Sequence, residues 1–161
     1  MRILGIDPGY DRCGWAVIEQ VGNQVTVIAY DCLTPPKKSD KLERFQLLWQ
    51  SLAEIFTQYQ PEELAIESLY FSRNVSTALP VSEVRGLLFG LAFEKGIPIT
   101  EYAPNQIKLS VTGYGRADKT QVLTMITKLL GLEKSPKIDD TGDALAVALT
   151  HATYCRNQRK L

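Results

Sequence analysis

The spacing of the apolar residues changes near residue 40, and this change limits the folds that the chain can adopt. Three runs rich in Ile, Val, Trp and Tyr come first, over residues 2–7, 13–20 and 24–33. A Pro-Gly and a Gly-Asn pair mark turns between them, so the runs predict three strands in an antiparallel arrangement. From residue 42 to 59 the apolar residues recur every three or four positions instead. That period predicts an amphipathic helix, which follows Asp40 as its cap and ends before Pro61.

The rest of the chain alternates between the two patterns. Strands are expected at 63–68 and 97–102, and helices at 75–95, 104–112, 118–130 and 140–156. This order predicts an α/β fold with a five-stranded mixed sheet flanked by helices on both faces. The strands at 2–7 and 63–68 could be neighbours in that sheet.

Length and composition favour an ordinary single domain over residues 1–161, with a frayed basic tail at about 157–161. Eighteen acidic residues balance eighteen basic ones, which argues against binding of nucleic acid by bulk charge alone. Three widely spaced cysteines predict neither a disulfide framework nor a zinc site. With no export signal and no long apolar run, we expect a soluble cytoplasmic protein without a membrane partner.

Four acidic residues stand where apolar or neutral side chains would be easier to accommodate. Asp7 ends the first strand, Glu67 ends the fourth, and Asp140 and Asp143 open the apolar last helix. A spacing of three places Asp140 and Asp143 on one helix face. Crowded carboxylates need a cation, and all-oxygen ligation suits Mg²⁺ or Mn²⁺. Two such ions could clamp a phosphodiester and activate water.

Each of these acids also has a structural interpretation. Asp7 could form the turn at Pro8-Gly9, and Glu67 could be a surface acid at a strand end. Asp140 could cap its helix, and Asp143 could favour the positive end of the helix dipole. Asp139 adds a neighbouring acid, which suits capping or solvation. No single acid is diagnostic.

The combination of motifs resembles the RuvC family of Holliday-junction resolvases. The matching stretches are GIDPG with Gly14 following, AIE at 65–67 leading into YFSRN, SEVRG at 82–86, NQIKLSVTGYGRADKTQV at 105–122 and DDTGDALAVALTHA at 139–152. The resemblance covers nearly the whole chain and implies a ribonuclease-H-like fold. It departs from the family at Cys13, where Thr is frequent, and at the additional Asp139.

The resemblance implies that four acids bind the metal and catalyse cleavage: Asp7, Glu67, Asp140 and Asp143. It implies two Mg²⁺ ions for each site, with Mn²⁺ as a substitute. It also implies a homodimer that nicks two opposed strands of four-way junction DNA in recombination and repair. A two-fold dimer presents identical sites to two equivalent strands. A branch-migration motor of the RuvA and RuvB type is the implied partner.

Aromatic and basic residues form a second group of candidates, for DNA binding: Tyr70, Arg73, Lys108, Arg116 and Lys119. Exposed rings can stack on unpaired bases and cations meet phosphates, and the resemblance favours Tyr70 as the residue at the junction centre. The alternative is that Tyr70 or Phe71 packs into the core. Basic residues beside a glycine turn can also be merely solvated, but the resemblance favours Lys108 and Lys119 as holders of the scissile backbone.

Three further predictions remain. His151, the single histidine, is expected to be structural rather than a general base. The apolar residues of the 75–95 helix are expected in the core, and the resemblance implies that some meet a partner subunit. The leading function is a Mg²⁺-dependent endonuclease that leaves 5′-phosphate and 3′-hydroxyl ends. Two alternatives stay open, namely a single-lobe relative of actin-like ATPases and a catalytically silent junction-binding module.

Overall fold

The computed structural model describes residues 1–69 and 75–158, with the side chains of 75–77, 157 and 158 excepted. The strands are β1 (Arg2–Asp7), β2 (Cys13–Val21), β3 (Gln24–Leu33), β4 (Glu63–Glu67) and β5 (Ile99–Tyr102). The helices are α1 (Lys41–Tyr59), α2 (Val75–Glu94), α3 (Pro104–Thr112), α4 (Lys119–Leu129) and α5 (Asp139–Gln158). This order confirms the expected succession of elements, and α5 continues two residues beyond the expected end at 156.

The strands form one mixed sheet in the order β3-β2-β1-β4-β5. β1 pairs antiparallel with β2, and β2 with β3, because short turns connect them. β1 also pairs parallel with β4, and β4 with β5, across connections that contain helices. The expected neighbourhood of the first and fourth strands is therefore confirmed.

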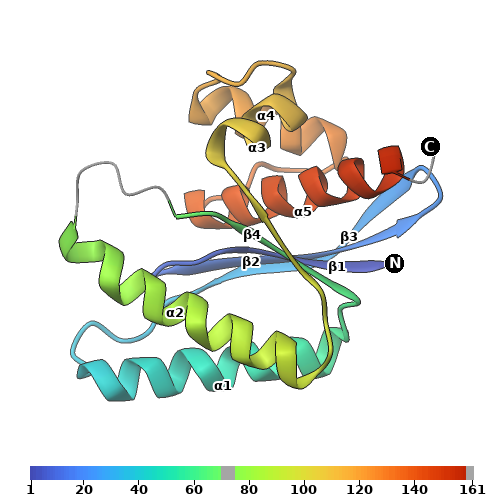
Figure 1. Ribbon diagram of the computed structural model, residues 1–161. Coiled ribbons are helices and arrows are strands. Elements are labelled where there is room, and N and C mark those ends of the chain that lie inside the picture. The colour runs from blue at the N-terminus through green and yellow to red at the C-terminus, as the bar shows by residue number, and fades with distance from the viewer. Residues whose placement is uncertain (70–74, 159–161) are drawn as a thin grey trace.

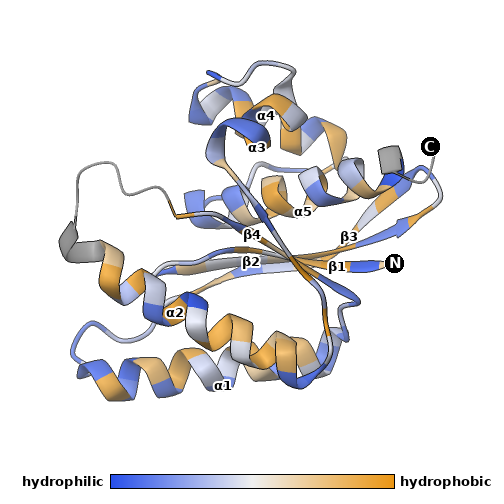
Figure 2. Cartoon of the chain, in the orientation of Figure 1, coloured by the Kyte–Doolittle hydropathy of each residue, from blue (hydrophilic) through white to orange (hydrophobic). Residues whose placement is uncertain are grey.

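Helices cover both faces of the sheet (Figure 1). α1 and α2 lie on one face, where Leu48, Phe56 and Leu88 belong to a buried cluster that includes strand residues. α5 lies on the opposite face with α3 and α4 packed outside it, and Leu145 and Ile126 belong to a second buried cluster on that face. The hydrophobic residues accordingly gather along the central strands (Figure 2). The expectation of helices on both faces is confirmed.

The alternation of side chains along β1 decides which face receives its terminal acid. Leu4 and Ile6 are buried in the cluster with α1 and α2, whereas Ile3 is buried in the cluster with α5. Gly5 also lies against α5. Because strand side chains alternate with a period of two, Asp7 follows Ile3 and Gly5 toward the α5 face.

β4 repeats this arrangement. Leu64 and Ile66 belong to the cluster with α1 and α2, and Ala65 belongs to the cluster with α5. Glu67 follows Ala65 in phase and therefore faces α5 as well. The parallel register pairs Ile6 with Ile66, so the next step along both strands brings Asp7 and Glu67 to the same sheet edge.

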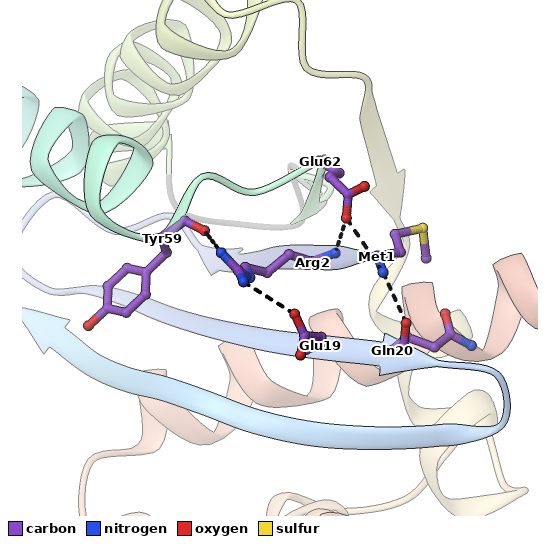
Figure 3. Close-up of polar contacts among 6 residues, drawn as sticks. All are labelled: Met1, Arg2, Glu19, Gln20, Tyr59 and Glu62. Atoms are coloured by element: carbon purple, nitrogen blue, oxygen red, sulfur yellow. Dashed lines mark hydrogen bonds and ion pairs between the residues drawn. The ribbon is translucent and has the colours of Figure 1, made fainter.

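A network of polar contacts fixes the opposite end of β1 (Figure 3). The Arg2 guanidinium donates to the Tyr59 carbonyl at 2.8 Å and lies 3.3 Å from the Glu19 carboxylate. The Arg2 amide donates to Glu62 at 2.6 Å, and the amino terminus of Met1 donates to a β2 carbonyl. These contacts join β1 to β2, to the end of α1 and to the start of β4, and so hold the register that places Asp7.

Candidate active site

Two close backbone approaches bring α5 to the acid end of the sheet. A Cβ atom on Gly5 would lie 2.5 Å from the Ala144 carbonyl oxygen, and one on Gly14 would overlap the Asp140 carbonyl. Gly14 is also the residue that pairs with Asp7 across β1 and β2. The absence of side chains at these two positions therefore lets the first turn of α5 settle beside Asp7.

The start of α5 separates Asp140 from its neighbour Asp139. The Ile138 carbonyl accepts hydrogen bonds from the amides of Thr141 and Gly142, so Asp140 lies inside the first turn rather than at the capping position. The Asp140 side chain is mostly buried, whereas that of Asp139 is exposed. The positions favour Asp140 over Asp139 as a member of the site and argue against the capping interpretation of Asp140.

The electrostatics of Asp7 show that all four predicted acids share one environment. Burial, and then the charges of Asp143, Glu67 and Asp140, raise the pKa of Asp7 to about 8. Lys119 acts in the opposite direction on this carboxyl. A partly buried acid with three more acids nearby is costly to ionise unless a cation is present. The structure thus brings the predicted quartet together.

The pKa values of two other acids move in the same direction. Burial and the charge of Asp143 raise the pKa of Glu67, against the lowering effect of Lys119 and Lys108. Burial likewise raises the pKa of Asp143, although its hydrogen bond with Lys119 opposes the change. A cation brought to this cluster would relieve the cost of holding these carboxylates in their charged form.

Two side-chain cations already lie against the acids of α5. Lys119 Nζ is 3.1 Å from Asp143 Oδ2 and 3.9 Å from Asp139 Oδ2. Arg12 Nε is 3.1 Å from Asp140 Oδ2. That oxygen is buried and has no hydrogen-bond partner within the described residues, so its contact with Arg12 is an ion pair without hydrogen-bond geometry.

These ion pairs bear on whether the acids fit a divalent cation. Among the described residues, no group of three or more His, Cys, Asp or Glu side chains is arranged to hold a metal ion. Asp143 meets Lys119 and Asp140 meets Arg12, so both carboxylates have a cationic partner of their own. The donor set nevertheless suits Mg²⁺ or Mn²⁺, because it consists of carboxylates alone. The raised pKa of Asp7 indicates the cost of charge that such an ion would relieve, and Asp140 Oδ2 is buried with no hydrogen-bond donor of its own among the described residues.

Basic residues from α3 and α4 line the open side of the acids. A pocket of about 250 Å³ is bounded by Glu67, Asp143, Lys108 and Lys119 together with apolar residues. Lys119 begins α4, where the Asp118 carboxylate caps the helix by accepting from the Gln121 amide. Lys108 and Lys119 are therefore held on helices beside the acids.

The remaining DNA-binding candidates either lie farther from the acids or fall outside the described residues. Arg116 is exposed in the connection between α3 and α4. Among the described residues, no ion pair joins Arg116 to the acids, whereas Lys119 and Arg12 each form one. Tyr70 and Arg73 lie outside the described residues, and so does Phe71. Their predicted roles stay predictions.

Sequence reasoning missed a buried arginine that supports Glu67. Arg85 on α2 donates from Nη1 to the Glu67 carbonyl at 2.5 Å and from Nη2 to the Glu101 carboxylate at 2.6 Å. Ser68, next along the chain, donates from its amide to the Tyr102 carbonyl at 2.9 Å. These contacts fix the end of β4 and the backbone that carries Glu67. The SEVRG motif was the available signal, but a motif alone does not reveal that its arginine binds a distant carbonyl.

His151 belongs to a different cluster. Its Nδ1 lies 2.9 Å from the Tyr102 hydroxyl, and its Nε2 lies 3.5 Å from a Glu63 oxygen and 3.5 Å from Cys155 Sγ. The ring is buried, and burial lowers its pKa although Glu63 acts to raise it. Glu63 begins β4 whereas Glu67 ends it, so His151 lies at the other end of this strand from the acids. The position agrees with a structural role.

The fold has the strand order and the helix layers of the ribonuclease-H-like class. Its four acids lie near the carboxyl ends of the central strands, β1 and β4. Its backbone resembles that of a solved structure described as Thermus thermophilus RuvC in complex with Holliday junction substrate. The TM-score is 0.92 at 32% sequence identity, and the alignment covers 98% of this chain and 96% of that one.

The sequence comparisons give the family. A family model described as crossover junction endodeoxyribonuclease RuvC matches residues 3–151, and the chain belongs to this RuvC family. A relative from Heliobacterium modesticaldum with the same description is 45% identical over 97% of this chain and 100% of its own length. One from Thermotoga maritima is 40% identical over 99% of this chain and 95% of its own length.

Within residues 1–69 and 75–158, no helix combines the length and the apolar character that crossing a bilayer requires.

Proposed function

We propose that this protein is a divalent-metal-dependent endonuclease that resolves four-way DNA junctions by paired symmetric nicks. The observation that carries the proposal is the environment of Asp7, a partly buried acid whose pKa three further acids help to raise to about 8. Membership of the RuvC family supports the same conclusion, since relatives over the full length are described as crossover junction endodeoxyribonucleases.

Four carboxylates would hold the metal, which we propose to be two Mg²⁺ ions, with Mn²⁺ as a substitute: Asp7, Glu67, Asp140 and Asp143. When bound, such ions supply a nucleophile from water and neutralise the charge that develops on the phosphodiester. Asp7 and Glu67 project from strand ends, and the other two acids from a helix packed on that sheet. Rigid elements thus fix the positions of the ligands. Such fixed positions suit an in-line attack of water on phosphorus, in which the 3′ oxygen leaves. The products would carry 5′-phosphate and 3′-hydroxyl ends.

Lys119 and Lys108 would position the scissile strand. Both line the pocket that also contains Glu67 and Asp143, so a phosphate held by these ammonium groups would lie beside the acids. Lys119 would also stabilise negative charge as it develops in the transition state. Tyr70, Arg73 and Arg116 are further proposed contacts with the junction.

A homodimer is the proposed assembly. One chain presents one acid cluster, and a two-fold dimer would offer two equivalent clusters to two equivalent strands. Leu79 and Phe93 on α2 are 70% and 72% exposed, which supports this helix as part of the contact between subunits. We further propose that the dimer works in the cytoplasm beside a branch-migration motor of the RuvA and RuvB type.

The deciding experiment incubates purified protein with an end-labelled mobile four-way junction, first with Mg²⁺ and then with EDTA. Paired symmetric nicks that disappear in EDTA are expected. Asp7→Asn should abolish cutting and leave junction binding largely intact, whereas the matched variant Asp139→Asn should still cut.

Other outcomes would contradict the proposal. Hydrolysis of ATP without cutting would favour the ATPase alternative, and junction binding without cutting by the wild-type protein would favour the silent module. Resolution by Asp7→Asn at the wild-type rate would overturn the site assignment. The comparisons already disfavour both alternatives, because the full-length match is to a nuclease family.

A further inference from the structure

Arg12 is a positively charged residue at the site, and it has no role in the nuclease mechanism proposed above. It lies in the connection between β1 and β2, and its Nε approaches Asp140 Oδ2 to 3.1 Å. The Arg12 side chain is 54% exposed, whereas that of Asp140 is 19% exposed. The guanidinium therefore reaches a largely buried carboxylate while roughly half of its own side chain remains open to solvent.

A second arginine anchors the backbone that carries Arg12. Arg44 on α1 is 6% exposed and donates to the Asp11 carboxylate at 3.0 Å and to the Pro36 carbonyl at 3.1 Å. It also donates to the Tyr10 carbonyl at 3.5 Å, and its guanidinium carbon lies 4.9 Å from the centre of the Tyr10 ring. The two residues before Arg12 are thus held by a buried charge that the chemistry of the acids does not use.

The backbone of the connection is fixed on its other side as well. A Cβ atom on Gly9 would overlap the carbonyl of Arg12, so these two backbone segments are in close contact. Cys13, which follows, is fully buried at the start of β2. The backbone of Arg12 is therefore held at both ends, and only its long side chain is free to change partners.

A divalent ion bound by Asp140 would compete with Arg12 for the negative charge of the same carboxylate. If Asp140 binds a divalent ion, that ion repels the guanidinium of Arg12 and weakens its ion pair with the carboxylate, so the side chain is released. A guanidinium released at the rim of the site has five N–H donors in a planar fork, which matches the oxygens of a phosphate group. The released side chain and the incoming DNA strand would then meet at the same opening.

We propose that Arg12 exchanges partners during the reaction. In the metal-free protein it neutralises Asp140, and once a divalent cation takes that carboxylate, Arg12 binds a phosphate of the junction strand. The inference rests on the proposed function, because it requires Asp140 to be a metal ligand. It makes Arg12 a competitor of the metal before DNA arrives and a phosphate-binding residue afterwards.

The first test measures Mn²⁺ affinity in the absence of DNA, by the electron paramagnetic resonance signal of free Mn²⁺. Arg12→Gln should bind Mn²⁺ about three- to tenfold more tightly, because the competing ion pair is partly exposed and of modest strength. Lys128→Gln is the control, since it removes the same charge at the far end of α4 from Lys119. Its Mn²⁺ affinity should equal that of the wild-type protein.

The second test measures junction binding by fluorescence anisotropy with Ca²⁺ in place of Mg²⁺. Arg12→Gln should bind the junction about three- to tenfold more weakly, and the salt dependence of binding should fall by about one phosphate contact for each subunit engaged. Arg12→Lys should restore both properties in large part, because it returns the charge. If Arg12 only stabilised the fold, its replacement would not raise the Mn²⁺ affinity and would not change the salt dependence of junction binding.

The outcomes separate this inference from the function on which it rests. A wild-type protein that binds Mn²⁺ while Arg12→Gln binds it no more tightly would overturn the exchange and leave the nuclease proposal standing. Unchanged junction affinity and salt slope in Arg12→Gln would do the same. A wild-type protein that binds no Mn²⁺ would overturn both the proposed metal site and the exchange.

Discussion

Asp7 illustrates at the scale of a single residue how the fold prepares a site for a cation. Its position at the end of β1 follows from strand alternation, and its burial follows from the close approach of α5. Both are properties of the metal-free chain, so the gathering of the acids lowers its free energy of unfolding. A functional site that lowers stability in this way is a common feature of enzymes.

The cost predicts how stability depends on pH. The pKa of Asp7 is about 8 in the folded protein, whereas a free Asp side chain has a pKa of about 3.9. Between these values the native state holds a proton that the unfolded state has lost, so the free energy of unfolding falls as pH rises. From pH 6.5 to 8 the wild-type, metal-free protein should lose about 1.5 kcal/mol from this group.

Urea unfolding in EDTA at pH 6.5, 7.2 and 8.0 measures the effect. Asp7→Asn cannot ionise at this position and should show little change in unfolding free energy over the same range. Asp139→Asn is the matched control, because Asp139 is exposed and should leave the wild-type slope in place. Equal slopes in the wild-type protein and Asp7→Asn would show that Asp7 titrates below this window.

At the scale of elements, the site depends on how closely α5 approaches β1 and β2. Ala144 and Ala148 of α5 lie against Gly5, and the first turn of the helix lies against Gly14. α5 carries two of the four acids, so its position relative to the strands sets the distance between Asp140 and Asp7. A single added methyl group at the interface is enough to change that distance.

Gly14→Ala tests this dependence. The new Cβ would overlap the Asp140 carbonyl, so backbone must move and we expect a loss of about 1–3 kcal/mol in unfolding free energy. Displacement of a catalytic group by about 1 Å can cost a hundredfold in rate, and junction cleavage should fall by about that factor.

Gly22→Ala provides the comparison for Gly14→Ala. Gly22 has a φ of 60° in the turn between β2 and β3, and nothing lies within 4 Å of the position of an added Cβ. Its replacement should cost about 1 kcal/mol through backbone strain and leave the cleavage rate of the folded protein unchanged. Equal cleavage by both variants would mean that the position of Asp140 tolerates the shift.

The elements themselves could be predicted from the sequence because their signals are local. Period and turn residues placed the strands at 2–7 and 24–33 with their observed limits, and Asp40 does cap α1 by accepting from the Glu43 amide. β5 is shorter than expected, since it begins at Ile99 rather than at 97.

The supporting contacts of the site could not be predicted in this way. Arg85 binds a carbonyl on β4, and Arg44 binds carbonyls in two separate connections. No spacing rule identifies a backbone acceptor that becomes adjacent only after folding. The four acids could be predicted because each stands at the end of a strand pattern or the start of a helical one, and because their combination matches a known family. The pairing of Arg12 with Asp140 could not, since it depends on a loop conformation that no local pattern reveals.

At the scale of the whole molecule, one face of α2 meets no partner among the described residues of the single chain. Val84 and Leu88 are buried against the sheet, while Leu79 and Phe93 are exposed on the same helix. Gly86 and Gly90 lie between these two, and an added Cβ at either would meet nothing within 4 Å. Large apolar side chains that flank an open glycine surface suit close packing against another helix.

The proposed dimer therefore predicts that Phe93→Asp weakens self-association. In sedimentation velocity the wild-type protein should behave as a dimer, and the variant should dissociate at least about tenfold more readily, because a carboxylate would be buried without a partner. Leu129→Asp is the control, since Leu129 is also exposed but lies on α4, across the sheet from α2. It should remain a dimer.

The same variant connects assembly to the symmetry of cutting. A protein that acts as separate monomers has no means of placing two sites on two strands at once, so Phe93→Asp should nick one strand and release the junction before the second cut. A supercoiled plasmid with an extruded cruciform distinguishes these products, because paired nicks give linear DNA and single nicks give open circles. Linear product at the wild-type rate from a Phe93→Asp protein that sediments as a monomer would refute the link between dimerisation and paired cleavage.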